Sequence, residues 1–140
     1  MNGPVAYLLD TNILSETRKR KANPKVMAFL NSSAPAILFI SVLTIGELRE
    51  GVEKKRRKDP IEAQGLEAWV ATTEEQYREN TLGIDLAIAR LWGKWSADRS
   101  RPVVDTLLAA TAAHHNLTLV TRNIRDVHGL PVTVLNPWQD

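Results

Sequence analysis

Four acidic side chains occupy related positions in the pattern of strands and helices that this 140-residue chain predicts. Asp10 ends the apolar run VAYLL (5–9), and Asp126 follows the apolar run LTLVT (117–121). Glu47 and Asp105 lie in the first turns of two expected helices. Carboxylates that gather at one place bind divalent cations, and a bound cation makes water a nucleophile at neutral pH. The chemistry that these residues suggest is therefore metal-assisted hydrolysis.

Four short apolar runs predict strands that are covered on both faces, because their apolar residues are continuous rather than alternating. Helical patterns separate the runs, so we expect one α/β domain over residues 1–140, with a central parallel sheet flanked by helices. Within it, residues 61–98 should form a helical hairpin packed on one side. The expected strands are 5–9, 36–41, 117–121 and 132–135, and the expected helices are 23–31, 44–58, 61–80, 83–98 and 102–115.

The four acids should meet at one edge of this sheet. Asp10, Glu47 and Asp126 leave from the carboxyl ends of their strands, where open α/β sheets bind ligands. Asp105 opens a helix that runs back towards the other end of the sheet, so its first turn should lie at the same edge. The hydroxyl and amide side chains of Thr121, Asn12 and Asn123 are close by in sequence and could orient the carboxylates.

Each acid also has a purely structural explanation. Asp10 could cap the helix that begins near Asn12, and Asp105 could gain from the dipole of its helix. Asp126 could stabilise a turn, and Glu47 could simply face solvent. Together, however, four neighbouring carboxylates repel one another and destabilise the protein unless a cation binds among them. Oxygen ligands of this kind fit Mg2+ or Mn2+.

Zinc fits the chain poorly. There is no cysteine, which also excludes a disulfide framework. His114 and His115 are adjacent on an expected helix, so their side chains point in different directions and cannot share a metal ion.

The charge distribution is uneven, which is compatible with a polyanionic partner for the first part of the chain but on charge alone favours solvated helices. Residues 1–58 hold 11 Lys and Arg against 5 Asp and Glu, a net of +6, whereas residues 59–140 hold 7 against 11, a net of −4. No apolar run approaches the roughly 20 residues of a membrane helix, and the N-terminus lacks a signal-peptide pattern, so we expect a cytoplasmic protein.

Five segments stand in a fixed order along nearly the whole chain: LLDTN (8–12), TIGELREGV (44–52), DTLLAATAAHH (105–115), LTLVTRNIRDV (117–127) and VLNPW (134–138). In this order and spacing they resemble the PIN-domain ribonucleases of the VapC type, in particular their FitB-like branch. The resemblance implies a three-layer sandwich with a central parallel sheet of four to five strands. One departure is the segment SADRSRPVV (96–104), which is more basic than the resemblance leads us to expect.

The resemblance also implies a function. It implies the toxin of a type II toxin–antitoxin pair, a homodimeric endoribonuclease that depends on Mg2+ or Mn2+ and leaves 5′-phosphate and 3′-hydroxyl ends. A small antitoxin would inhibit it, and DNA would be bound through the antitoxin only. The family's acidic quartet corresponds to Asp10, Glu47, Asp105 and Asp126 as catalytic residues and metal ligands, and its helper hydroxyl corresponds to Thr121. Residues expected to hold the RNA backbone are Arg18, Lys19, Arg20, Lys21, Lys54, Lys55, Arg56, Arg57 and Arg122.

Two other functions remain open at this point. The first is a PIN-like module that binds RNA or protein without catalysis. The second is a phosphotransfer protein on a similar sheet. If it were an aspartate phosphatase, it would need a second aspartate two residues after the first, where this chain has Asn12. If it were a receiver domain, it would need a lysine after its last strand, where this chain has Asn136, Pro137 and Trp138.

Overall fold

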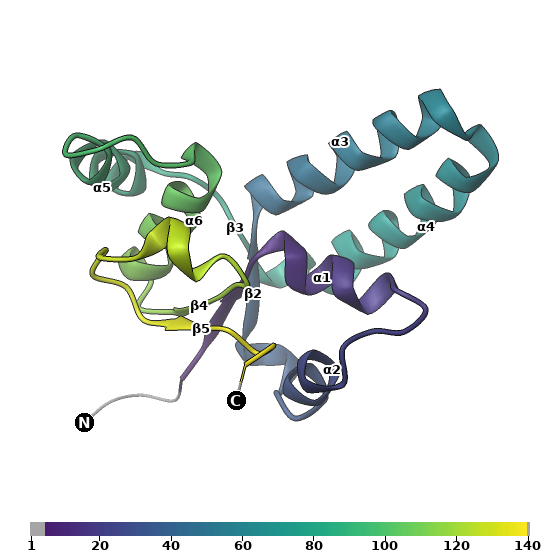
Figure 1. Ribbon diagram of the computed structural model, residues 1–140, viewed down its shortest axis with the longest axis horizontal. Coiled ribbons are helices and arrows are strands. Elements are labelled where there is room, and N and C mark those ends of the chain that lie inside the picture. Colours follow the sequence, from purple (N-terminus) through teal and green to yellow (C-terminus); the bar gives the residue numbers. More distant parts are fainter. Residues whose placement is uncertain (1–4, 140) are drawn as a thin grey trace.

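A five-stranded parallel sheet forms the centre of the computed structural model, which describes residues 5–139 (Figure 1). All four strand pairs are parallel and the spatial order is β3-β2-β1-β4-β5. Strand order therefore reverses between β1 and β4, and a ligand is expected at the carboxyl ends of these two strands. The strands are β1 (Tyr7–Leu9), β2 (Leu38–Ser41), β3 (Thr81–Leu82), β4 (Thr118–Val120) and β5 (Val134–Leu135).

Six α-helices and three short 3-10 segments connect the strands. Several helices begin as the sequence suggests. The Asn23 side chain accepts hydrogen bonds from the first-turn amides of α2, and the Asp59 side chain does the same for α4. The helices are α1 (Thr11–Arg18), α2 (Pro24–Asn31), α3 (Val42–Lys58), α4 (Pro60–Gln76), α5 (Leu86–Ser96) and α6 (Val103–His114), and the 3-10 segments are η1 (Pro35–Ile37), η2 (Arg78–Asn80) and η3 (Ile124–Val127).

Each face of the sheet has its own hydrophobic core. The adjacent residues Leu8 and Leu9 of β1 point to opposite faces and are both fully buried. Leu9 packs with residues from α1, α2, α3 and α4, whereas Leu8 packs with residues from α5 and α6. The expected three-layer α/β architecture is therefore confirmed, and the continuous apolar strands are explained by burial on both sides.

The expected helical hairpin over residues 61–98 is wrong. Helix α4 pairs with α3, and these two helices project together from the sheet (Figure 1). Helix α5 packs on α6 instead. The physical reason is that α4 buries Val70 in the core on one face of the sheet, whereas α5 buries Ile88 and Trp95 in the core on the other. Strand β3 carries the chain from the first face to the second.

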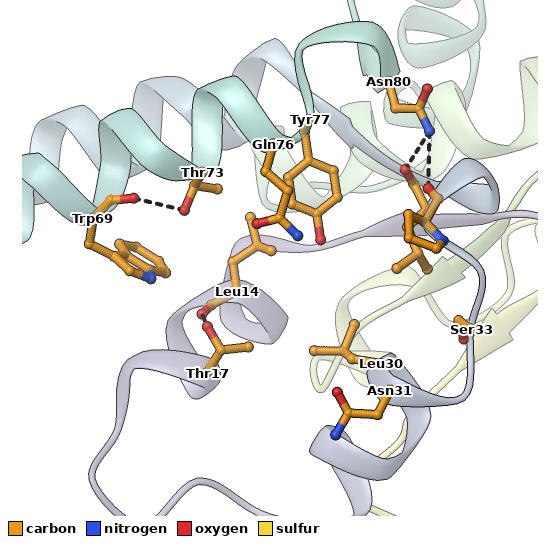
Figure 2. A pocket seen from close by; sticks show the side chains of 12 residues that line it. Leu14, Thr17, Leu30, Asn31, Ser33, Trp69, Thr73, Gln76, Tyr77 and Asn80 are labelled. Carbon is orange, nitrogen blue, oxygen red and sulfur yellow. Dashed lines mark hydrogen bonds between the residues drawn. The ribbon is translucent and has the colours of Figure 1, made fainter.

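Strand β3 was not among the expected strands. It has only two residues, pairs with the end of β2, and has too little sequence to show a periodic pattern. Its position is set partly by Asn80, whose side-chain amide donates to the carbonyl oxygen of Leu38 at 2.9 Å and to those of Pro35 and Ala36 at 3.4 and 3.3 Å (Figure 2). Within residues 5–139, no helix is long and apolar enough to cross a membrane.

Replacing Asn80 tests this positioning role. Asn80→Ala should lower the free energy of unfolding by about 1 kcal/mol, because it removes the hydrogen bonds that tie η2 to the start of β2. Urea denaturation with an unchanged m-value would measure the effect. Asn31→Ala, an exposed position at the end of α2, is the matched control and should change stability by less than about 0.5 kcal/mol. Equal effects of the two substitutions would contradict the role given to Asn80.

Candidate active site

The fold brings the four acids to one edge of the sheet. Asp10 follows β1 directly and is the N-cap of α1. Asp126 lies in η3, which follows β4, and Glu47 lies in α3, which follows β2. Asp105 lies in the first turn of α6. The charges of Asp10, Asp126 and Glu47 all act on the Asp105 carboxyl group, so the four side chains are electrostatic neighbours, as the sequence pattern predicts.

Asp10 is buried and held through both of its carboxylate oxygens. Thr121 Oγ1 donates to Oδ2 at 2.7 Å, and the backbone N–H of Thr11 donates to Oδ1 at 2.6 Å. Asn12 Nδ2 donates to Oδ2 at 3.3 Å. Burial raises the pKa of Asp10 above its ordinary value, although the hydrogen bonds from Thr121 and Thr11 lower it. Thr121 therefore orients this carboxylate and favours its charged form.

Glu47 is exposed and is positioned by a residue that the sequence analysis did not single out. Thr11 Oγ1 donates to Glu47 Oε1 at 2.6 Å. Thr11 Oγ1 also lies 3.2 Å from the buried hydroxyl oxygen of Thr44. A threonine hydroxyl has one proton, so Thr11 can donate to Glu47 while it accepts from Thr44. The sequence signal was present, since Thr11 stands between Asp10 and Asn12 in the motif DTN.

The carboxyl groups of Asp105 and Asp126 are close enough for a hydrogen bond between them to contribute to the pKa of Asp105. Such a bond requires a proton on one of the two groups. Burial, together with the charges of Asp10 and Asp126, this hydrogen bond and the charge of Glu47, raises the pKa of Asp105 to about 7. At neutral pH the Asp105 carboxyl group is therefore protonated for much of the time, which relieves its repulsion with the neighbouring carboxylates.

The chemistry of these side chains fits a hard divalent cation, since the site offers carboxylate oxygens and an amide oxygen. Asn12 Oδ1 is buried beside Asp10 and has no hydrogen-bond donor among the described residues, so it can accept from a water molecule bound to a cation. Within residues 5–139, however, no three acidic or histidine side chains converge on one point closely enough to hold an ion as they stand. Binding of a cation would therefore require these side chains to move closer together.

The basic residues expected to hold RNA do not gather at the acids. Arg18 lies over the Trp69 ring, Lys19 pairs with Glu16, and Arg122 lies over the Trp138 ring. In the second run, Lys54, Lys55 and Arg56 form ion pairs with acids of α3 and α4. This run is 7 to 11 residues beyond Glu47, or roughly 10–17 Å along α3. Arg20, Lys21, Arg57 and Lys58 are exposed.

A separate hollow of about 280 Å3 opens between α1, α2 and α4 (Figure 2). Its lining combines apolar side chains, such as Leu14, Leu30 and Trp69, with the polar groups of Thr17 and Gln76. Such a lining suits an amphipathic segment of another protein better than a charged substrate.

The geometry defines a class of protein, an α/β domain with carboxylates from four elements at the switch point of a parallel sheet. The PIN domain model matches residues 7–127, and the chain belongs to this family. Among curated relatives, "Toxin FitB" of Neisseria gonorrhoeae is 29% identical over 140 residues, covering 95% of this chain and 99% of the relative. "VapC ribonuclease Y4jK" of Sinorhizobium fredii is 28% identical over 144 residues, covering 94% and 97%.

Solved structures show the same similarity. The "Structure of FitAB bound to IR36 DNA fragment" has a TM-score of 0.76 and 25% identity, and covers 96% of both chains. The "Toxin-antitoxin complex from Klebsiella pneumoniae" has a TM-score of 0.73 and 26% identity, and covers 94% of this chain and 98% of its own. The resemblance inferred from the sequence motifs is confirmed.

The raised pKa of Asp105 predicts a stability effect that depends on pH. The folded-state value of about 7 lies above the ordinary value of 3.8, so the stability of the metal-free protein falls as pH rises from about 4 to about 7. Asp105→Asn removes this loss. It should stabilise the protein by about 1 kcal/mol at pH 8, after allowance for solvent screening, and by almost nothing near pH 4.

Chemical denaturation in EDTA at the two pH values measures this difference. Asp98→Asn, at an exposed aspartate of the loop before α6, is the matched control and should show no such pH-dependent gain. If Asp105→Asn instead destabilises the protein at pH 8, the Asp105 carboxylate is not repelled by the neighbouring carboxylates.

Proposed function

We propose that this protein is a metal-dependent endoribonuclease that acts as the toxin of a type II toxin–antitoxin pair. The observation that carries the proposal is the convergence of Asp10, Glu47, Asp105 and Asp126 at the switch point of the sheet. The family and the names of the relatives, a toxin and a ribonuclease, support the same conclusion. A non-catalytic module would have no need to maintain four mutually repelling carboxylates.

Asp10 and Asp105 would be the principal ligands of Mg2+ or Mn2+, and Glu47 and Asp126 would complete the ligand set or orient the attacking water. The bound ion supplies a water molecule of lowered pKa and neutralises charge on the phosphate oxygens during hydrolysis. Thr121 favours the charged form of Asp10 and fixes its orientation, and Thr11 fixes the orientation of Glu47. These hydrogen bonds matter because a carboxylate binds a metal ion well only when its orientation is fixed.

The products would carry 5′-phosphate and 3′-hydroxyl ends, and the active form would be a homodimer in the cytoplasm. Both features follow from the family resemblance. They are open to test by sequencing RNA ends after brief expression and by measuring the mass of the protein in solution.

A small antitoxin protein would control the nuclease. Structures similar to this chain include a toxin–antitoxin complex and a FitAB complex bound to DNA. We assign the hollow between α1, α2 and α4 to the amphipathic segment of such a partner, because its lining combines apolar side chains with polar groups. DNA would be bound through the partner only.

RNA cleavage should require Mg2+ or Mn2+ and stop in EDTA. Asp105→Asn should reduce the rate by at least about 100-fold, since it removes a ligand and a charge that the metal site needs. The measurement is the cleavage of total RNA by the purified protein with manganese. Asp98→Asn should retain full activity. Full activity of Asp105→Asn with an intact fold would refute the assignment of the site.

The inhibiting partner should place an arginine among the four carboxylates. A guanidinium is always charged and binds carboxylates through two parallel hydrogen bonds, so it competes directly with a divalent cation. Replacing that arginine by alanine should restore manganese binding to the complex and weaken inhibition. Replacing another arginine of the partner, one that lies outside its inserted segment, should do neither. If the manganese affinity of the complex is the same with and without this arginine, the partner inhibits only by blocking the access of RNA.

A further inference from the structure

Three arginines line a pocket that adjoins the acidic site. The pocket has a volume of about 180 Å3, and its lining consists of Arg99, Ser100, Arg101, Pro102, Arg125 and Asp126. Two of the arginines come from the loop between α5 and α6, and the third precedes Asp126 in η3. Because Asp126 lines the pocket and also belongs to the acidic cluster, the pocket and the acidic site share a wall.

Two of these arginines are fixed by the same acceptor. Arg99 Nη2 and Arg101 Nη1 donate to the carbonyl oxygen of His128 at 3.1 and 3.2 Å. A guanidinium carries five N–H groups, so one such bond orients each side chain and leaves most of its donors available. The loop before α6 is thereby held against the segment after η3.

The positive charge of the pocket is not neutralised from within. Among residues 5–139, none of the three arginines forms an ion pair, although Asp126 lines the same pocket. Arg101 Nε is buried and has no acceptor among the described residues. A buried donor without a partner is destabilising. An anion that enters the pocket would supply the missing acceptor.

The N-terminus of helix α6 adds to the positive electrostatic potential of the pocket. The helix begins after Pro102, which lines the pocket, and no side chain of the described residues caps its first amide groups. A helix N-terminus favours an anion, and two arginines beside it strengthen that preference.

We propose that the pocket formed by Arg99, Arg101 and Arg125 binds a backbone phosphate of the RNA next to the phosphate that is cleaved. This proposal rests on the nuclease function proposed above and identifies the cationic group that positions the substrate. It also explains how a strongly acidic site holds a polyanion: the phosphate beside the scissile one binds guanidinium groups, so the repulsion by the carboxylates is offset locally. The basic run on α3 serves this role less well, because most of it is paired with acids of α3 and α4.

The first test uses inorganic phosphate and needs no RNA. The Nε–H resonance of Arg101, assigned by its loss in Arg101→Lys, should shift saturably as phosphate is added to the metal-free protein in EDTA. Sodium chloride of equal ionic strength should not reproduce the shift. Arg99→Ala should weaken phosphate binding, whereas Arg90→Ala, at an exposed arginine of α5, should leave it unchanged. Absence of a saturable shift would overturn the proposal.

The second test measures RNA binding without cleavage. A labelled oligo-uridylate of about ten nucleotides, in EDTA, reports affinity by fluorescence anisotropy. Arg99→Ala combined with Arg101→Ala should weaken binding about tenfold and lower the log–log salt slope by about 0.7, the value for one lost phosphate contact on a single strand. The matched control removes the same charge elsewhere: Arg90→Ala combined with Lys94→Ala, at two exposed positions of α5, should have little effect.

The outcomes separate the two proposals. If wild type cleaves RNA with manganese but the pocket double variant binds RNA with unchanged affinity and salt slope, the pocket assignment fails and the nuclease stands. If wild type neither binds nor cleaves RNA, both fail, even if phosphate still binds. If the pocket variant instead loses only the binding of a protein partner, the pocket recognises carboxylates of that partner and the RNA assignment is wrong.

Discussion

Repulsion among carboxylates is the constraint on which the rest of this structure depends. Four acids from different elements act on one another at the carboxyl edge of the sheet, and such a cluster opposes folding unless something compensates it. Two compensations are visible. Asp10 receives hydrogen bonds on both oxygens, and the pKa of Asp105 is raised to about 7, so that it is partly protonated at neutral pH. A cation can replace the proton of Asp105, while the hydrogen bonds to Asp10 keep that ligand oriented.

The sheet makes this arrangement rigid. Asp10 follows a central strand whose residues Leu8 and Leu9 are buried in two different cores, so β1 cannot shift without disturbing both faces. Thr121 follows β4 and binds Asp10 across the switch point, which ties the two strand ends together by a side-chain contact as well as by the ladder between β1 and β4.

The sequence predicts the parts of this molecule that local pattern encodes. The acids, four strands and the helix that bears Asp105 could be placed because apolar runs, turns and caps are local signals. The helix that packs against α4 could not be predicted, because apolar helices fit either of the two cores. The chain passes from one face of the sheet to the other through β3, which has only two residues and no recognisable pattern. Thr11 was missed for a related reason: its contact with Glu47 spans 36 residues, and no spacing rule connects them.

Basic residues show the limit of charge counting most clearly. The longest basic run, Lys54 to Lys58, is the strongest signal for a polyanion partner in the sequence, yet most of its charge is met by glutamates of α3 and α4. The three arginines around the pocket beside Asp126 are scattered in sequence and lie in the acidic part of the chain, but they have no ion-pair partner within residues 5–139. A cation that is already paired must break that pair to bind a phosphate, whereas an unpaired one need not. The pairing of each charge, rather than its number in a segment, therefore decides where a polyanion can be held.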